Sequence, residues 1–91
     1  MFKFQGKRVI VTGGTRGIGL EVCRILHGMG ANVVASYASN RTAAEALERE
    51  LPGIVTFGGD LGDETTARGL VDCCYESFGG LDVLINNAGI W

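Results

Sequence analysis

The sequence contains few of the residues on which disulfide-bonded or metal-binding domains depend. In 91 residues it has one proline, one histidine and three cysteines. Cys23, Cys73 and Cys74 are odd in number and lack the spacing of metal ligands, which argues against a disulfide framework and against a zinc site. We therefore expect three inert, reduced thiols and no metal site.

Long apolar runs and a strong net charge are also missing. No run approaches the roughly 18 consecutive apolar residues of a membrane-spanning helix. The formal charge of -2 offers no basic face to nucleic acid. The first residues lack the apolar stretch and cleavage site of a signal peptide. We expect no membrane or nucleic-acid partner and, by default, a cytoplasmic location, with an organelle as the alternative.

Glycine, in contrast, is in excess. The chain has 15 glycines, where average usage gives roughly six. Neither a collagen-like period nor a low-complexity tract accounts for them, so tight backbone turns are the natural cause. A chain of this length forms one compact domain, and it has little stability to spare for a missing structural neighbour.

Apolar periodicity divides the chain into short strands that alternate with amphipathic helices. The pattern predicts strands at Arg8–Thr12, Ala31–Ser36, Ile54–Phe57 and Leu81–Ile85. Helical spacing places Ile18, Val22, Ile25, Leu26 and Met29 on the buried face of the first helix. The third helix is expected to bury Ala67, Leu70, Val71, Cys74 and Phe78.

Capping signals mark where the later helices begin and end. Thr42 with Glu45 three residues on has the pattern of a capping box at the start of the second helix. Asp63 is expected to cap the third helix, and Gly79 with Gly80 to end it.

Strands joined by helices imply right-handed crossovers and a parallel sheet with helices on both faces. The order β-α-β-α-β-α-β is therefore the N-terminal half of a doubly wound, Rossmann-like α/β fold, for which we expect the sheet order 3-2-1-4. In that arrangement the fourth strand is an exposed apolar edge, which favours aggregation or pairing with another chain. We accordingly expect weak or absent independent folding.

A glycine-rich loop, Thr12 to Gly19, lies between the first strand and the first helix. Gly13 permits a sharp exit from the strand, Gly17 leaves room for a pyrophosphate, and Gly19 lets the helix approach the sheet. The first amides of a helix have no partner within it, and the helix dipole favours an anion there. We expect the amides of residues 13–19 to hold a diphosphate; a glycine-rich turn without a ligand is the alternative.

The spacing T-G-x-x-x-G-x-G, together with Asn86-Asn87-Ala88-Gly89 after the fourth strand and Asp60-Leu61 after the third, resembles the short-chain dehydrogenase/reductase family. The resemblance covers essentially all 91 residues and is strongest to the 3-oxoacyl-carrier-protein reductase type, with hydroxysteroid-type dehydrogenases close behind. It implies a nicotinamide dinucleotide site, with Asp60 at the adenine ring and a segment at residues 86–89 that lines the cofactor cleft and ties the first and fourth strands together. The alternative is that Asp60 and the asparagines only form turns.

The sequence favours NADP(H) over NAD(H). No aspartate or glutamate occurs from Val22 through Ala44, and Tyr37 occupies the place of the carboxylate that binds the ribose 2′-hydroxyl in NAD sites. Arg16 lies in the glycine loop itself, and Ser39, Asn40 and Arg41 follow the second strand as further donors for a 2′-phosphate. A solvated surface arginine is the alternative for Arg41. The full set of predicted cofactor-binding residues is Gly13, Thr15, Arg16, Gly17, Ile18, Gly19, Tyr37, Ser39, Asn40, Arg41, Asp60, Leu61, Asn86, Ala88 and Gly89.

The catalytic groups of the family are missing from these residues. The family uses a tyrosine with a lysine four residues later and an orienting serine, whereas the only lysines here are Lys3 and Lys7. We therefore predict no catalytic residue. We interpret residues 1–91 as a single, incomplete domain: the cofactor-binding part of an NADP(H)-dependent oxidoreductase. Its longer form is expected to act on a small carbonyl or alcohol, with a homo-oligomer as a candidate assembly. A noncatalytic nucleotide- or partner-binding module and an unstable truncated product are the alternatives.

Overall fold

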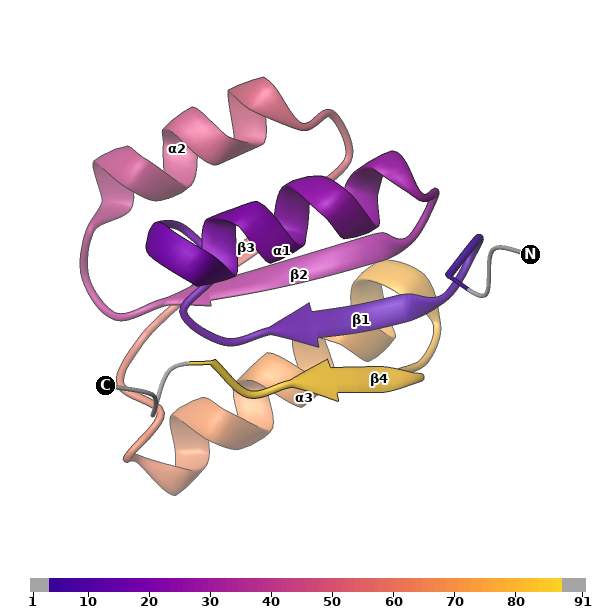
Figure 1. The fold of residues 1–91 in the computed structure, drawn as a ribbon. Coiled ribbons are helices and arrows are strands. Elements are labelled where there is room, and N and C mark those ends of the chain that lie inside the picture. Colours follow the sequence, from indigo (N-terminus) through magenta and orange to yellow (C-terminus); the bar gives the residue numbers. More distant parts are fainter. Residues whose placement is uncertain (1–3, 88–91) are drawn as a thin grey trace.

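The fold is known from a computed structural model, which describes residues 4–87. Seven elements alternate along the chain (Figure 1): β1 (Arg8–Val11), α1 (Gly17–Gly28), β2 (Asn32–Tyr37), α2 (Arg41–Glu50), β3 (Val55–Gly58), α3 (Glu64–Phe78) and β4 (Val83–Ile85). All strand pairs are parallel, and the sheet order is β3-β2-β1-β4. The predicted Rossmann-like fold and strand order are confirmed.

The sheet is covered on both faces, by α1 and α2 on one and by α3 on the other (Figure 1). In β1, Val9 and Val11 pack towards α1 and α2, whereas Ile10 packs towards α3. All three side chains are fully buried. Such a β-branched run, buried on both faces, is typical of a central parallel strand.

The predicted buried face of α1 is wrong at two positions. Ile18 and Ile25 are exposed, whereas Leu26 is buried as predicted, together with Gly19 and Cys23, which were not predicted. Apolar residues recur at helical spacing on both faces of α1, so periodicity alone does not select one. The face with the smallest side chains turns inward, because only small residues allow the helix to lie this close to the loop that precedes it.

The predicted start of α2 is also wrong. The N-cap is Asn40, whose Oδ1 accepts a hydrogen bond from the Ala43 N–H at 3.0 Å, and Thr42 lies within the first turn. Asparagine is a stronger N-cap than threonine, so the helix begins earlier than the capping box indicated. Glu45 lies 3.4 Å from the guanidinium of Arg41 instead of capping the helix.

The predicted limits of α3 are confirmed. The Asp63 carboxylate accepts a hydrogen bond from the Thr65 N–H at 2.9 Å, and Gly79 ends the helix with a φ of 83°. Val71 is an exception on the predicted inner face, because it is exposed. The helix packs across β1, β2 and β3, which leaves the side that carries Val71 uncovered.

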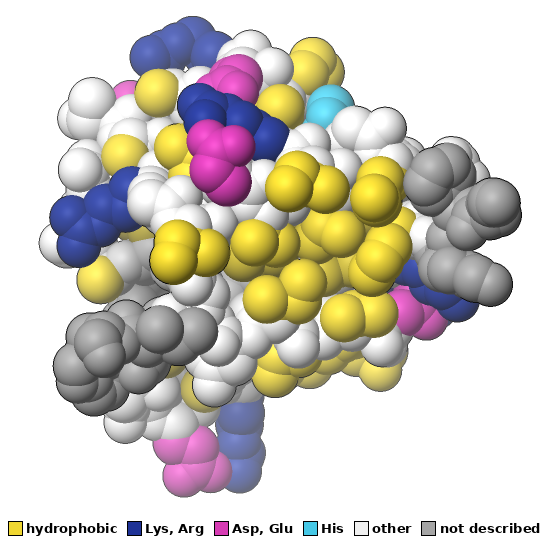
Figure 2. All heavy atoms as spheres, in the orientation of Figure 1, with side chains coloured by type: hydrophobic (Ala, Val, Ile, Leu, Met, Phe, Trp, Pro, Cys, Tyr) yellow, Lys and Arg dark blue, Asp and Glu magenta, His cyan; other side chains and the backbone are white. Residues whose placement is uncertain are grey.

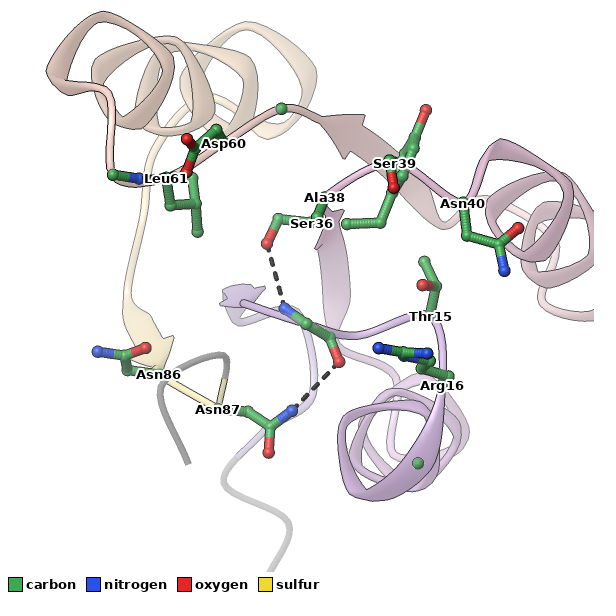
Figure 3. Close-up of a pocket in the computed structure, with 15 residues that line it drawn as sticks. Thr15, Arg16, Ser36, Ala38, Ser39, Asn40, Asp60, Leu61, Asn86 and Asn87 are labelled. Carbon is green, nitrogen blue, oxygen red and sulfur yellow. Dashed lines mark hydrogen bonds between the residues drawn. The ribbon is translucent and has the colours of Figure 1, made fainter. Parts of the chain in front are cut away.

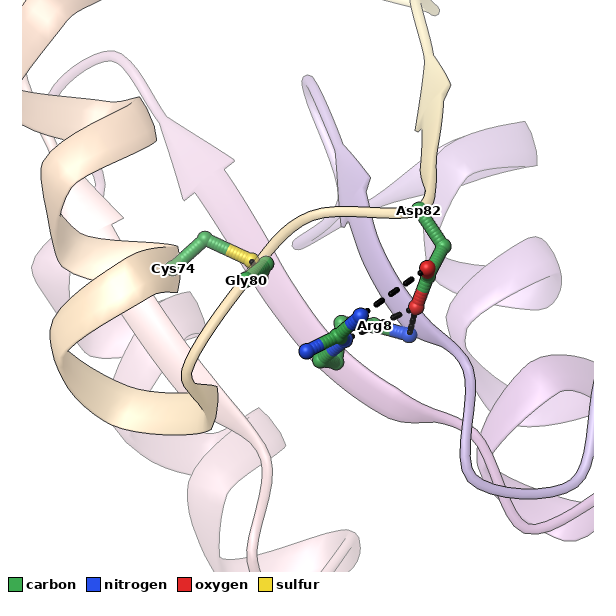
Figure 4. A network of polar contacts seen from close by, with 4 residues as sticks. All are labelled: Arg8, Cys74, Gly80 and Asp82. Atoms are coloured by element: carbon green, nitrogen blue, oxygen red, sulfur yellow. Dashed lines mark hydrogen bonds and ion pairs between the residues drawn. The ribbon is translucent and has the colours of Figure 1, made fainter.

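Strand β4 is shorter than predicted, because Leu81 and Asp82 both precede it. The Asp82 carboxylate accepts hydrogen bonds from the Arg8 backbone N–H at 2.9 Å and from Nε and Nη2 of the same residue at 2.8 and 3.0 Å (Figure 4). Nearby, the Cys74 thiol donates to the Gly80 carbonyl at 3.2 Å. These contacts connect the end of α3 and the start of β4 to the beginning of β1.

The three cysteines lie within helices, Cys23 in α1 and Cys73 and Cys74 in α3. Burial raises the pKa of the Cys23 thiol to about 12, and it also raises the pKa of Cys74. Among residues 4–87 no three side chains of the metal-binding types gather in one place. Within the same residues, no helix has the length and hydropathy to cross a bilayer.

Candidate functional site

A cavity of about 1050 Å³ opens at the carboxyl ends of the strands (Figure 3). Four segments form its walls: the loop after β1, the end of β2 with the loop that follows it, the turn after β3 and the residues after β4. In a doubly wound sheet, ligands bind at this edge, where the strand order reverses between β1 and β4.

Most of the predicted site residues meet in this cavity. Those that line it are Gly13, Thr15, Arg16, Gly17, Tyr37, Ser39, Asn40, Asp60, Leu61 and Asn86. Ile18, Gly19 and Arg41 do not line it. Ala88 and Gly89 lie outside the described residues. The cavity also includes residues that the sequence analysis did not select, namely Ser36, Ala38, Gly59, Gly62 and Asn87.

The glycine loop has the geometry that its sequence predicted. Gly13 and Gly17 have φ values of 64° and 61°, which side chains disfavour. A Cβ at Gly17 would meet no atom within 4 Å, so the space beside this residue is open. A Cβ at Gly19 would overlap the carbonyl oxygen of Gly13 and lie 2.7 Å from Nδ2 of Asn87. Gly19 therefore allows α1 to pack directly against the loop, which explains why it faces inward.

The loop amides are divided between two tasks, which corrects the expectation that all of them face a ligand. The N–H of Gly13 donates to Oγ of Ser36 at 3.2 Å, and the N–H of Gly14 donates to the Ser36 carbonyl at 3.0 Å. The N–H groups of residues 17–19, in the first turn of α1, have no acceptor among residues 4–87. The amides available to an anion are therefore those of the helix N-terminus.

The segment after β4 is connected directly to this loop. The Asn87 backbone N–H donates to Oγ1 of Thr12 at 2.8 Å, and its Nδ2 donates to the Gly13 carbonyl at 3.1 Å. The Thr12 hydroxyl in turn donates to Oδ1 of Asn86 at 3.0 Å. Of the adjacent asparagines only Asn86 was predicted to be a site residue, yet both contact Thr12, and Asn87 also reaches the Gly13 carbonyl. The sequence signal that could have found Asn87 is its position directly after Asn86.

Charge in the cavity is sparse. Among the described lining residues, Arg16 is the only cation and Asp60 the only anion. Arg16 forms no ion pair with any residue from 4 to 87. Oδ1 of Asp60 accepts a hydrogen bond from the Gly62 N–H at 2.9 Å, so this carboxylate shapes the turn after β3 as well as lining the cavity.

The three described residues that were predicted for the site but do not line the cavity each have a structural reason. Ile18 points outward from α1 and is 71% exposed. Arg41 points along α2 towards Glu45. The third, Gly19, contributes close packing rather than cavity surface.

Comparison with known proteins agrees with this geometry. The family model described as short chain dehydrogenase matches residues 7–91. An uncharacterised oxidoreductase of Methylorubrum extorquens is 39% identical over all of this chain and 38% of its own length. Versicolorin reductase of Emericella nidulans is 38% identical over 98% of this chain and 35% of its own.

A solved structure shows the same likeness in three dimensions. The crystal structure of a short chain dehydrogenase from Burkholderia cenocepacia in complex with NADP superposes with a TM-score of 0.90 at 39% identity, over 97% of this chain and 38% of that one. The chain thus spans little more than a third of the length of these relatives. The family match over residues 7–91, the relatives and the shared fold establish that the chain belongs to the short-chain dehydrogenase/reductase family.

Proposed function

We propose that this chain is the cofactor-binding part of an NADP(H)-dependent oxidoreductase that interconverts a carbonyl and an alcohol. One observation carries the proposal: the cavity lies against the N-terminus of α1, where the amides of residues 17–19 have no acceptor among residues 4–87. When bound, a nicotinamide dinucleotide supplies or accepts the hydride in such a reaction. Residues 1–91 then form a single, incomplete domain.

The residues of the cavity fit a dinucleotide. The open space beside Gly17 lets a diphosphate approach the first turn of α1. Asp60 and Leu61, after β3, line the cavity, and we assign them to the adenine ring. Asn86 also lines the cavity. We assign Ala88 and Gly89 to cofactor binding from the family resemblance alone.

The charges favour NADP(H) over NAD(H). The loop after β2 offers no carboxylate to a ribose 2′-hydroxyl, because the lining residues there are Tyr37, Ala38, Ser39 and Asn40. Arg16 lies in the same cavity and forms no ion pair within residues 4–87, so its charge suits a 2′-phosphate. Asn40 uses its Oδ1 to cap α2, which leaves Nδ2 as its donor. Arg41 is the weaker candidate, since it faces Glu45.

We assign no catalytic residue to this chain. No tyrosine in the 91 residues is followed by a lysine four positions later. An unassisted tyrosine, with a pKa near 10, is a poor acid at neutral pH. We therefore expect the chain to bind the cofactor without turning over a substrate, and the carbonyl or alcohol to be the substrate of a longer form.

Cofactor titration tests the proposal. We expect NADPH to bind with a micromolar Kd, measured by nicotinamide fluorescence or calorimetry, and NADH to bind more weakly. Circular dichroism and a cooperative unfolding transition establish that the sample is folded. A folded sample that binds neither nucleotide would overturn the proposal, and carbonyl-dependent oxidation of NADPH would overturn the absence of catalysis.

The outer edge of β4 favours a second function, that of a noncatalytic module that binds another polypeptide. Leu84 on this strand is 57% exposed, and no strand among residues 4–87 pairs with that edge. The partner we would expect is a full-length relative. Co-elution of the chain with the Methylorubrum extorquens oxidoreductase in size-exclusion chromatography would support this function, and separate elution would argue against it.

A further inference from the structure

The peptide groups around Gly13 are held from both sides, by Ser36 of β2 and by Asn87, which follows β4 (Figure 3). On one side, Oγ of Ser36 accepts a hydrogen bond from the Gly13 N–H at 3.2 Å. On the other, Nδ2 of Asn87 donates to the Gly13 carbonyl at 3.1 Å. Gly13, the first glycine of the loop, is thus fixed at its nitrogen and at its oxygen.

Ser36 is set in place by the sheet. It is 2% exposed, near the end of β2, and the ladder places it opposite Phe57 of β3. Its carbonyl also accepts the N–H of Gly14 at 3.0 Å, so a single residue holds two consecutive loop amides. The position of Ser36 therefore depends on strand pairing rather than on the conformation of the loop.

We infer that Ser36 is a positioning residue for cofactor binding: its hydroxyl fixes the Gly13 peptide, so that the amides of residues 17–19 are already oriented for a diphosphate. This inference rests on the proposed function. The Gly13 N–H has no other acceptor among residues 4–87, so loss of the hydroxyl leaves it unsatisfied and lets the loop adopt other conformations. A ligand must then order the loop as it binds, which lowers affinity.

The experiment compares two ligands that differ at the diphosphate. NADP+ contains a diphosphate, whereas 2′-AMP retains the adenosine and the 2′-phosphate without it. We expect Ser36→Ala to weaken NADP+ about tenfold, as the loss of one buried hydrogen bond predicts, and to change the Kd of 2′-AMP less than twofold. Ser36→Thr, which keeps the hydroxyl, should restore most of the affinity for NADP+.

Val33→Ala is the matched control for stability. Val33 is buried on the same strand but packs in the core between the sheet and α1 and α2, away from the loop. This variant should lower the unfolding temperature without changing the ratio of the two dissociation constants.

Two results would overturn the inference: Ser36→Ala weakens NADP+ and 2′-AMP equally, or it weakens neither. A folded wild type that binds no NADP+ would instead overturn the proposed function.

Amide hydrogen exchange tests the inference in the wild type, whether or not the variants fold. Without nucleotide, the amides of Gly13 and Gly14 should exchange slowly and that of Gly17 quickly. Addition of NADP+ should slow the exchange of Gly17. Exchange of Gly13 as fast as that of Gly17 would show that Ser36 does not hold the loop, and would overturn the inference.

Discussion

The cavity and the outer edge of β4 are two borders of the same sheet with opposite character. At the cavity, backbone groups of the glycine loop are paired with Ser36 and Asn87. At the β4 edge, the described residues provide no pairing strand, and Leu84 of β4 is exposed. Large hydrophobic side chains are also exposed on α1 and α3. Figure 2 shows hydrophobic side chains gathered on the face that carries α1.

The difference follows from what each border requires. A nucleotide site needs a few backbone groups held by neighbouring strands, and the four strands present supply them. An apolar sheet edge needs a further strand and helices to cover it. Substitutions at the cavity should therefore alter nucleotide binding, and substitutions at β4 should alter association between chains and stability. The following predictions test that separation.

We expect the largest effect from Gly19→Ala. The added Cβ would overlap the Gly13 carbonyl oxygen, a backbone atom that cannot move without shifting the loop or α1. NADPH affinity should fall by roughly a hundredfold or more, since displacement of the phosphate-binding turn removes several hydrogen bonds at once. Isothermal calorimetry measures the change.

Gly28→Ala is the control for that substitution. Gly28 is also in α1, but a Cβ there would meet nothing within 4 Å. Alanine should leave nucleotide affinity unchanged and stabilise the helix by up to about 1 kcal/mol. A similar loss of affinity in both variants would contradict the close-packing explanation.

Arg16→Ala should have the next largest effect. Arg16 is the only cation among the described lining residues, so its removal should weaken NADPH at least tenfold and NADH little, because only NADPH carries the 2′-phosphate. Competitive titration of the two nucleotides gives the ratio. Arg68→Ala is the control, because Arg68 is exposed on α3 and paired with Glu64. It should change the affinity for neither nucleotide. Equal weakening of both nucleotides by Arg16→Ala would reject its role in phosphate recognition.

The glycine loop and the helix that follows it also show how much of the structure the sequence predicted. The order of elements, the strand order and the turn at Gly13 were predictable, because glycine spacing and β-branched runs act locally. The inward face of α1 was not, since Ile18 and Cys23 both satisfy helical periodicity and only contact with the loop decides between them. Ser36 was missed for a similar reason: a serine at a strand end has no pattern until the partner loop lies beside it.

Leu84→Lys tests the other border. A lysine on an edge strand opposes pairing with a second strand, so the variant should associate several-fold less than the wild type at the same concentration. Analytical ultracentrifugation measures association, and the Kd for NADPH should stay the same because Leu84 does not line the cavity.

Val71→Lys separates edge pairing from general hydrophobic association. Val71 is exposed on α3 rather than on a strand. If β4 associates through its backbone, this lysine should reduce association less than the lysine at Leu84. If the two variants reduce association equally, the exposed hydrophobic surface is the cause and the strand edge is not.

The smallest effect is expected from Asp82→Asn, at the beginning of the same border. Hydrogen bonds from the side chain and the backbone of Arg8 hold the pKa of Asp82 well below its usual value of 3.8. A carboxylate whose pKa falls on folding stabilises the fold fully above the unfolded pKa, and that contribution is lost as the pH falls towards the folded pKa. The variant should therefore be less stable than the wild type at pH 7, and the difference in the free energy of unfolding should shrink below about pH 4.

Urea denaturation between pH 7 and the acid range measures this difference in the free energy of unfolding. Asp72→Asn is the control, because Asp72 is exposed and forms no ion pair among residues 4–87. Since Asp82 fixes β4 to the start of β1, at the end of the sheet away from the cavity, NADPH affinity measured on the folded variant should not change, and a parallel loss of affinity would show that the two borders are coupled.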